Sequence, residues 1–260
     1  MKNKIPLPFL LIVLMVFTSF SSNAQEKEFY ELKTYTIKND DQEKRMDDYL
    51  EKAYLPALKR MGIQQIGVFK VRDDKYKKSD KIYVLTPYTS LSQFENTEKM
   101  LALDKAHLTD GADYINAKFE NPPYERINSV LLRAFPDMPK MRPTNVKGPR
   151  NERVYELRSY ESPTEALYKN KVSMFNEGGE VKLFESLGFN AVFYAEVISG
   201  DRMPNLMYMT TFPNMETRDS LWGNFGSSPK WKEISSMEKY QNNMNKLDRE
   251  LVYPTAYSDY

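Results

Sequence analysis

The chain of 260 residues has no cysteine, a single histidine and almost no net charge, with 37 basic against 36 acidic side chains. Without cysteine it cannot form disulfides, thiolate nucleophiles, cysteine-ligated zinc sites or iron–sulfur clusters. One histidine leaves almost no room for a histidine metal site or a catalytic triad within the chain. A formal net charge of +1 provides no basic excess to displace the counterions of a nucleic acid. We therefore expect no metal, no resident cofactor and no nucleic-acid partner.

The first 24 residues have the pattern of a secretory signal peptide. Two lysines near the start precede an apolar stretch at 9–17, and Ser22-Asn23-Ala24 places small residues before Gln25. The apolar stretch is shorter than the roughly 20 residues that a membrane-spanning helix needs. The pattern predicts cleavage after Ala24, export to the periplasm or the medium of a bacterial cell, and no transmembrane segment after processing.

The remaining chain contains an internal repeat. The segment Tyr30-Glu31-Leu32-Lys33-Thr34-Tyr35 recurs 125 residues later as Tyr155-Glu156-Leu157-Arg158-Ser159-Tyr160. Val68-Phe69 recurs at almost the same offset as Val192-Phe193. Several similar segments at nearly one offset indicate a duplication.

The duplication divides the chain into two copies of one unit. The first copy covers 25–136, the second covers 151–260, and a linker at 137–150 joins them. The linker contains several spaced prolines, which disfavour both a helix and a central strand. We therefore expect two domains with a semi-extended connection.

Each copy shows the same predicted order of elements. In the first copy, strands are expected at 29–37, 66–71, 82–88 and 124–135, with helices at 42–61 and 90–117. In the second, strands are expected near 153–160, 190–198, 205–212 and 249–257, with helices near 164–187 and 215–245. This βαββαβ order predicts an α+β fold of tandem ferredoxin-like domains. Because two helices cover only one face of each antiparallel sheet, we expect the two sheets to close on each other as a barrel.

Three segments of the second copy resemble the NIPSNAP family, in the dimeric α/β-barrel group of ferredoxin-like proteins. They are the Tyr-Glu-Leu-Arg-Ser-Tyr opening at 155–160, Ser228-Pro229-Lys230-Trp231, and Tyr253-Pro254-Thr255-Ala256-Tyr257-Ser258. The last two are similar to the family's Asp-Pro-x-Trp and Pro-Thr-x-x-Ser, although Ser228 replaces the usual aspartate. The first copy matches more loosely. The resemblance implies an α/β barrel formed within one chain and no particular activity, since relatives are linked to vesicle traffic and mitochondrial quality control.

Strand alternation divides the repeated segment into two sets of side chains. Glu156, Arg158 and Tyr160 point one way, and the intervening Tyr-Leu-Ser set points the other. Because the second set is more apolar, we expect it to face the helices, with the charged set between the sheets. A carboxylate, a guanidinium and a phenol there would bind an anionic or carbonyl-bearing ligand. The alternative is a polar network in which these groups pair with one another.

Two adjacent glycines, Gly178 and Gly179, fall inside the first predicted helix of the second copy. Together they cost roughly 2 kcal/mol relative to alanines in a helix. We expect a helix break here, which either is a plain junction between two helices or lets Asn176 and Glu180 reach the cavity. Tyr208, from a methionine-rich strand that could equally be ordinary core, completes the candidate ligand site.

The lone histidine, His107, lies 124 residues before Trp231. Some barrels of this superfamily hold haem through a helical histidine, and imidazole can also serve as a general base. The corresponding tryptophan favours an aromatic packing position instead.

The sequence supports two classes of function and leaves a third open, a purely structural exported protein. The first is an exported module that binds an unidentified small molecule or protein. The alternative is a cofactor-independent oxygenase or isomerase-like enzyme that uses Arg158, Tyr160 and Glu180. No nucleophile–base pair is evident, so the sequence leaves open whether the protein is an enzyme and whether it forms a homo-oligomer.

Overall fold

The computed structural model describes residues 26–72 and 80–260, so the predicted signal peptide lies outside the described residues. The first copy contains β1 (Phe29–Thr36), α1 (Asp40–Tyr49), the π-helical turn η1 (Leu50–Tyr54), α2 (Leu55–Arg60), β2 (Gly67–Val71), β3 (Lys81–Tyr88), α3 (Leu91–Leu101), α4 (Lys105–Asp110), α5 (Ala112–Ile115) and β4 (Arg126–Ala134). The second contains β5 (Val154–Glu161), α6 (Glu165–Phe175), α7 (Glu180–Ser186), β6 (Asn190–Ser199), β7 (Asn205–Phe212), α8 (Met215–Ser227), α9 (Pro229–Ser236), the 3₁₀ turn η2 (Glu238–Tyr240) and β8 (Lys246–Pro254).

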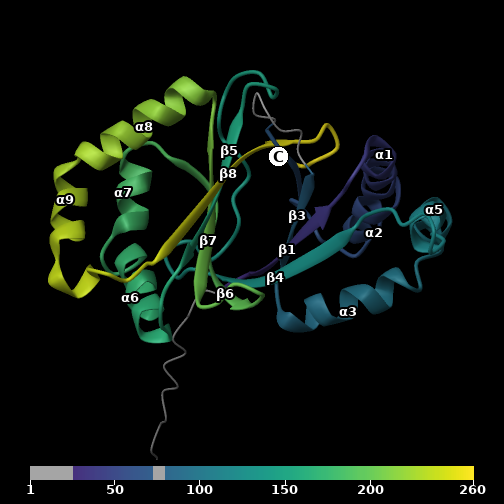
Figure 1. Cartoon of the computed structure of the whole chain (residues 1–260), viewed down its shortest axis with the longest axis horizontal. Coiled ribbons are helices and arrows are strands. Elements are labelled where there is room, and N and C mark those ends of the chain that lie inside the picture. The colour runs from purple at the N-terminus through teal and green to yellow at the C-terminus, as the bar shows by residue number, and fades with distance from the viewer. Residues whose placement is uncertain (1–25, 73–79) are drawn as a thin grey trace, which may run out of the picture.

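The eight strands form one closed antiparallel barrel in the order β1-β3-β2-β8-β5-β7-β6-β4. Strand β2 pairs with β8, and β4 pairs with β6, so each copy's sheet is joined to the other copy's sheet at both edges. The helices of the two copies lie on opposite sides of the barrel (Figure 1). The predicted fold is confirmed, and closure leaves no strand edge of the barrel without a partner.

Equivalent capping residues set the correspondence between the copies. Asn39 caps α1 and Thr164 caps α6, each accepting a hydrogen bond from the backbone N–H three residues later. Ser90 and Asn214 do the same for α3 and α8. These caps satisfy backbone donors that a helix start leaves free. Since the second pair lies 124 residues apart, each residue of α3 can be matched to one of α8.

Aromatic rings from both copies fill the closed part of the barrel lumen. Phe69 of the first copy lies 5.1 Å from Tyr155 of the second, measured between ring centroids. Tyr30 and Phe193 lie 5.6 Å apart across the same boundary. All four side chains are fully buried. One further core lies between each half of the barrel and the helices of that half. The lumen core is therefore shared, whereas each helix-side core comes mostly from one copy, with Phe135 of the first copy in the core of the second.

The adjacent glycines break the helix as predicted. Helix α6 ends at Phe175 and α7 begins at Glu180, with Gly179 at a φ of +85° that side-chain-bearing residues rarely adopt. A Cβ atom on Gly178 would lie 2.5 Å from the carbonyl oxygen of Met174. Both positions therefore require glycine for the chain to turn between the two helices.

Removing a shared ring should destabilise both copies together. We expect Phe69→Ala to lower the free energy of unfolding by about 3–5 kcal/mol, because it opens a cavity in the lumen core. Both tryptophans, Trp222 and Trp231, are in the second copy. Tryptophan fluorescence and far-UV circular dichroism should therefore shift together in a denaturant titration.

The control for this experiment is Phe119→Ala, since Phe119 is 95% exposed and should tolerate the same change. A circular dichroism transition that shifts while the tryptophan transition stays in place would mean that the copies unfold independently.

Candidate functional site

A cavity of about 480 Å³ opens at one end of the barrel lumen. Every strand except β2 contributes a side chain to its wall, so neither copy forms it alone. Its inner surface is apolar and includes Leu32, Val130, Leu157, Val197 and Met207. An eight-stranded barrel has an interior that either side chains or one small ligand can fill. Here the aromatic core fills one part of the lumen and leaves the other open.

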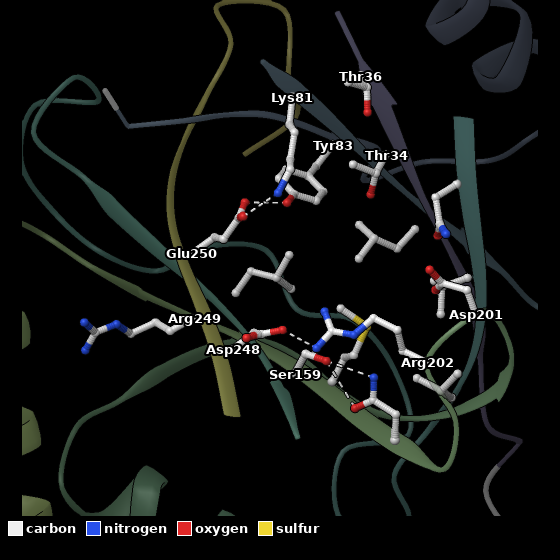
Figure 2. A pocket seen from close by; sticks show the side chains of 17 residues that line it. Thr34, Thr36, Lys81, Tyr83, Ser159, Asp201, Arg202, Asp248, Arg249 and Glu250 are labelled. Atoms are coloured by element: carbon white, nitrogen blue, oxygen red, sulfur yellow. Dashed lines mark hydrogen bonds and ion pairs between the residues drawn. The ribbon is translucent and has the colours of Figure 1, made fainter. Parts of the chain in front are cut away.

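The mouth of the cavity is polar, and its charges are largely compensated. The Glu250 carboxylate accepts hydrogen bonds from the Tyr83 hydroxyl and, at 2.7 Å, from Lys81 Nζ (Figure 2). Arg202 pairs with Asp248 in the same view and also with Glu161. Burial and the neighbouring Glu250 charge raise the pKa of Tyr83, so its hydroxyl stays protonated. The mouth therefore offers hydrogen-bonding groups with little net charge.

The predicted orientation of Glu156, Arg158 and Tyr160 is wrong. Leu157 lines the barrel lumen, and the charged set faces the helices of the second copy. Much of the lumen is filled by an apolar core, which favours the apolar set. Side chains of helices α6 and α8 supply charged and hydrogen-bonding partners on the helix side. These partners offset the cost of burying the charged set there.

The fully buried Glu156 is the centre of this helix-side network. It accepts hydrogen bonds from Arg218 Nε at 2.7 Å, Arg158 Nε at 2.7 Å and Trp222 Nε1 at 2.9 Å. The Arg158 guanidinium also lies 3.6 Å from the centre of the Trp222 ring. Burial by itself would raise the pKa of Glu156, but the two guanidinium groups outweigh it and hold that pKa below its usual range.

The network continues toward α6 and α7. Arg158 Nη1 donates to the Tyr160 hydroxyl at 2.9 Å, and that hydroxyl lies 2.7 Å from the Tyr208 hydroxyl. Nearby, Lys171 Nζ pairs with Glu180 at 3.3 Å. Burial raises the pKa of Glu180, and the Lys171 charge opposes this shift without cancelling it. Five of the six predicted site residues thus share one buried cluster.

Asn176, the sixth predicted residue, lies apart from that cluster. Its side chain donates to the Val172 carbonyl at 2.9 Å and accepts from the backbone N–H of Asp137 in the linker at 3.2 Å. Asn176 therefore holds the linker against the helix break. A ligand-binding role for all six residues stays a prediction, and the geometry resembles the alternative of mutually paired groups.

Sequence reasoning missed three members of the network, Lys171, Arg218 and Trp222. Arg218 and Trp222 are four residues apart on α8, a spacing that puts them on one helix face. That spacing could have indicated a cationic and aromatic partner for the charged strand.

His107 is a packing residue, as the repeat indicated. It is 5% exposed, and its ring nitrogens lie 3.1 Å from the Tyr49 hydroxyl and 3.0 Å from the Leu101 carbonyl oxygen.

Within residues 26–72 and 80–260, no cluster of three or more histidine or acidic side chains is arranged to hold a metal. In the same residues, no helix has the length and apolar character needed to cross a membrane.

The fold and the two-copy lumen define an α/β barrel built from tandem ferredoxin-like units. The NIPSNAP family model matches residues 155–259, so the second copy is a NIPSNAP domain. No curated protein matches the chain.

Solved structures share this architecture. A candidate monooxygenase from Lactobacillus acidophilus is 15% identical with a TM-score of 0.56, and the match covers 88% of this chain and 94% of that protein. A candidate monooxygenase from Fusobacterium nucleatum is 12% identical with a TM-score of 0.55, covering 88% and 93%. An anthrone oxidase-like protein is 9% identical with a TM-score of 0.50, covering 89% and 93%. At these identities the likeness establishes the fold.

The buried carboxylate makes a pH-dependent contribution to stability. Because the pKa of Glu156 is lower in the folded chain, its contribution is present above the unfolded value of about 4.3 and is lost as the pH falls through the folded value. We expect Glu156→Gln to lower the free energy of unfolding by about 3–5 kcal/mol at pH 7, since it leaves two buried guanidinium groups without their carboxylate.

Denaturant titrations of this variant and the parent at pH 7 and in acid would measure the difference. Glu216→Gln, at an exposed position on α8, is the control and should change stability by less than about 0.5 kcal/mol. A Glu156→Gln penalty that stays constant as the pH falls would contradict the charged network.

Proposed function

We propose that the protein binds one small, uncharged amphipathic molecule in the cavity of the barrel. The observation that carries this proposal is a cavity of about 480 Å³ with an apolar inner wall and a polar mouth, assembled from both copies. This volume lies in the range of small-molecule sites. The apolar body of the ligand would pack against Leu157 and Met207, with a hydroxyl or carbonyl directed toward the mouth.

The compensated mouth favours an uncharged ligand. Lys81 is already paired with Glu250, and Arg202 with Asp248. A charged ligand would lose its own hydration while competing with these pairs. An uncharged ligand needs only hydrogen bonds, and Ser159 and Asn205, which bond to each other at the same end of the lumen, have further donor and acceptor capacity.

A second proposed function is oxygenation or isomerisation of the bound molecule without a cofactor. The Glu250 carboxylate, held between Tyr83 and Lys81, faces the cavity and can accept a proton from a bound carbon acid. Similar folds described as candidate monooxygenases and as an anthrone oxidase-like protein support this function. Such a reaction would use residues of the lumen, and not Arg158, Tyr160 and Glu180, which the sequence suggested for an enzyme.

Anthrone, an uncharged tricyclic ketone, is a suitable probe for this second function. Oxygen uptake with anthrone that is lost in Glu250→Gln would support it. Uptake at the same rate in both proteins would exclude Glu250 as the base.

Filling the cavity should weaken ligand binding. Thr34 lines the cavity wall on β1, so Thr34→Trp would place an indole in the lumen (Figure 2). Binding of the neutral fluorescent probe N-phenyl-1-naphthylamine should weaken roughly tenfold or more in this variant, because the site loses volume and apolar wall.

The matched control is Thr109→Trp, which makes the same change at an exposed position of α4. Unchanged probe affinity in the folded Thr34→Trp variant would place the probe elsewhere and contradict the proposal.

We further propose that residues 1–24 direct export and are removed. Mass spectrometry of the protein expressed with its own N-terminus in a bacterial host should show a chain that begins at Gln25. Leu11→Arg combined with Leu14→Arg interrupts the apolar stretch and should leave the full-length chain in the cytoplasm. A wild-type chain that retains Met1 inside the cell would contradict export.

A further inference from the structure

The first copy contains a second pocket, of about 230 Å³, between its strands and α3. The Glu31 carboxylate, 5% exposed, lies in its wall. It accepts hydrogen bonds from Ser129 Oγ at 2.7 Å and the Tyr88 hydroxyl at 3.3 Å, and Lys33 Nζ lies 3.5 Å away. This pocket is separate from the barrel lumen, because alternate residues of β1 point to opposite faces.

In the second copy, side chains of the protein itself occupy the equivalent place. Arg218 lies between two carboxylates, at 2.7 Å from Glu156 and 2.6 Å from Asp219. The Trp222 indole covers Arg158 and donates to Glu156. The second copy thus closes this space with one guanidinium and one aromatic ring.

The first copy keeps the carboxylates and has one cation beside them, Lys33, where the second copy has two, Arg158 and Arg218. Glu31 corresponds to Glu156, and the capping correspondence matches Glu95 to Asp219. By the same correspondence Phe94 stands in place of Arg218.

The position of Trp222 is occupied in the first copy by Glu98, a third carboxylate in the pocket wall. Lys33 does not replace the missing cation, since it corresponds to Arg158, which is present in the second copy beside Arg218. Glu95 is paired only at the surface, with Lys99 at 3.2 Å, where such pairs contribute little.

We propose that this pocket binds a small organic cation, an amine or guanidine carried on an aromatic group. Its cationic group takes the position that Arg218 has in the second copy, near Glu31 and the carboxylates of α3. Its ring packs against Tyr54, Tyr88 and Phe94, which also line the pocket. Aromatic faces attract a desolvated cation and pack edge to face with a bound ring. The site therefore differs from the lumen in both location and ligand charge.

Isothermal titration calorimetry with 2-phenylethylamine, compared with the neutral 2-phenylethanol, tests this proposal. The two probes have nearly the same shape and differ in charge. We expect one molecule of amine to bind per chain. The affinity of the alcohol should be lower by roughly tenfold or more, since the alcohol lacks the charge-assisted hydrogen bond.

Two variants identify the site. Phe94→Arg supplies the second copy's own cation and should abolish amine binding while the far-UV circular dichroism spectrum is kept. Glu98→Gln, at an exposed position, removes one carboxylate without disturbing the core and should weaken the amine severalfold. Glu216→Gln, at an exposed position near the start of α8, is the matched control and should bind the amine like the parent.

Three results would overturn the proposal. They are equal affinity for amine and alcohol, no binding of the amine to the folded wild-type protein, or wild-type affinity in both Phe94→Arg and Glu98→Gln. These outcomes do not decide whether a ligand binds in the lumen. Thr34→Trp tests the lumen separately, because it fills the lumen and leaves this pocket intact.

Discussion

The structure depends on the pairing of two four-stranded sheets at both of their edges. Each copy alone would expose the backbone groups of its edge strands and one apolar face, and this chain has no cysteine with which to crosslink them. Pairing β2 with β8 and β4 with β6 satisfies those edges. The same pairing creates a lumen in which rings from both copies, such as Phe69 and Tyr155, pack together.

Closure of the barrel separates three spaces with different chemistry. The lumen is shared, mostly apolar, and open at one end, whereas each copy keeps its own space between strands and helices. In the second copy this space is closed by Arg218 and Trp222 around Glu156. In the first copy it remains a pocket. Duplication thus supplied two equivalent positions, and different residues on α3 and α8 gave them different properties.

The sequence predicted the architecture well, because repeats, strand alternation and glycine positions are local signals. The duplication at Tyr30 and Tyr155, the break at Gly179 and the packing role of His107 follow from such signals. The prediction of which face of β5 points into the lumen was wrong. Strand alternation defines two faces and does not say which of them meets the helices. That choice depended on the partners that α8 supplies to Glu156, which are distant in sequence.

The central claim is that the lumen, which neither copy forms alone, is a binding site for an uncharged molecule. A crystal structure of the protein with N-phenyl-1-naphthylamine tests it most directly. We predict density for the probe inside the barrel, in contact with Leu157 and Met207 and reaching toward Glu250. Density confined to the outer surface, for instance beside the exposed Phe119, with none in the lumen, would contradict the claim.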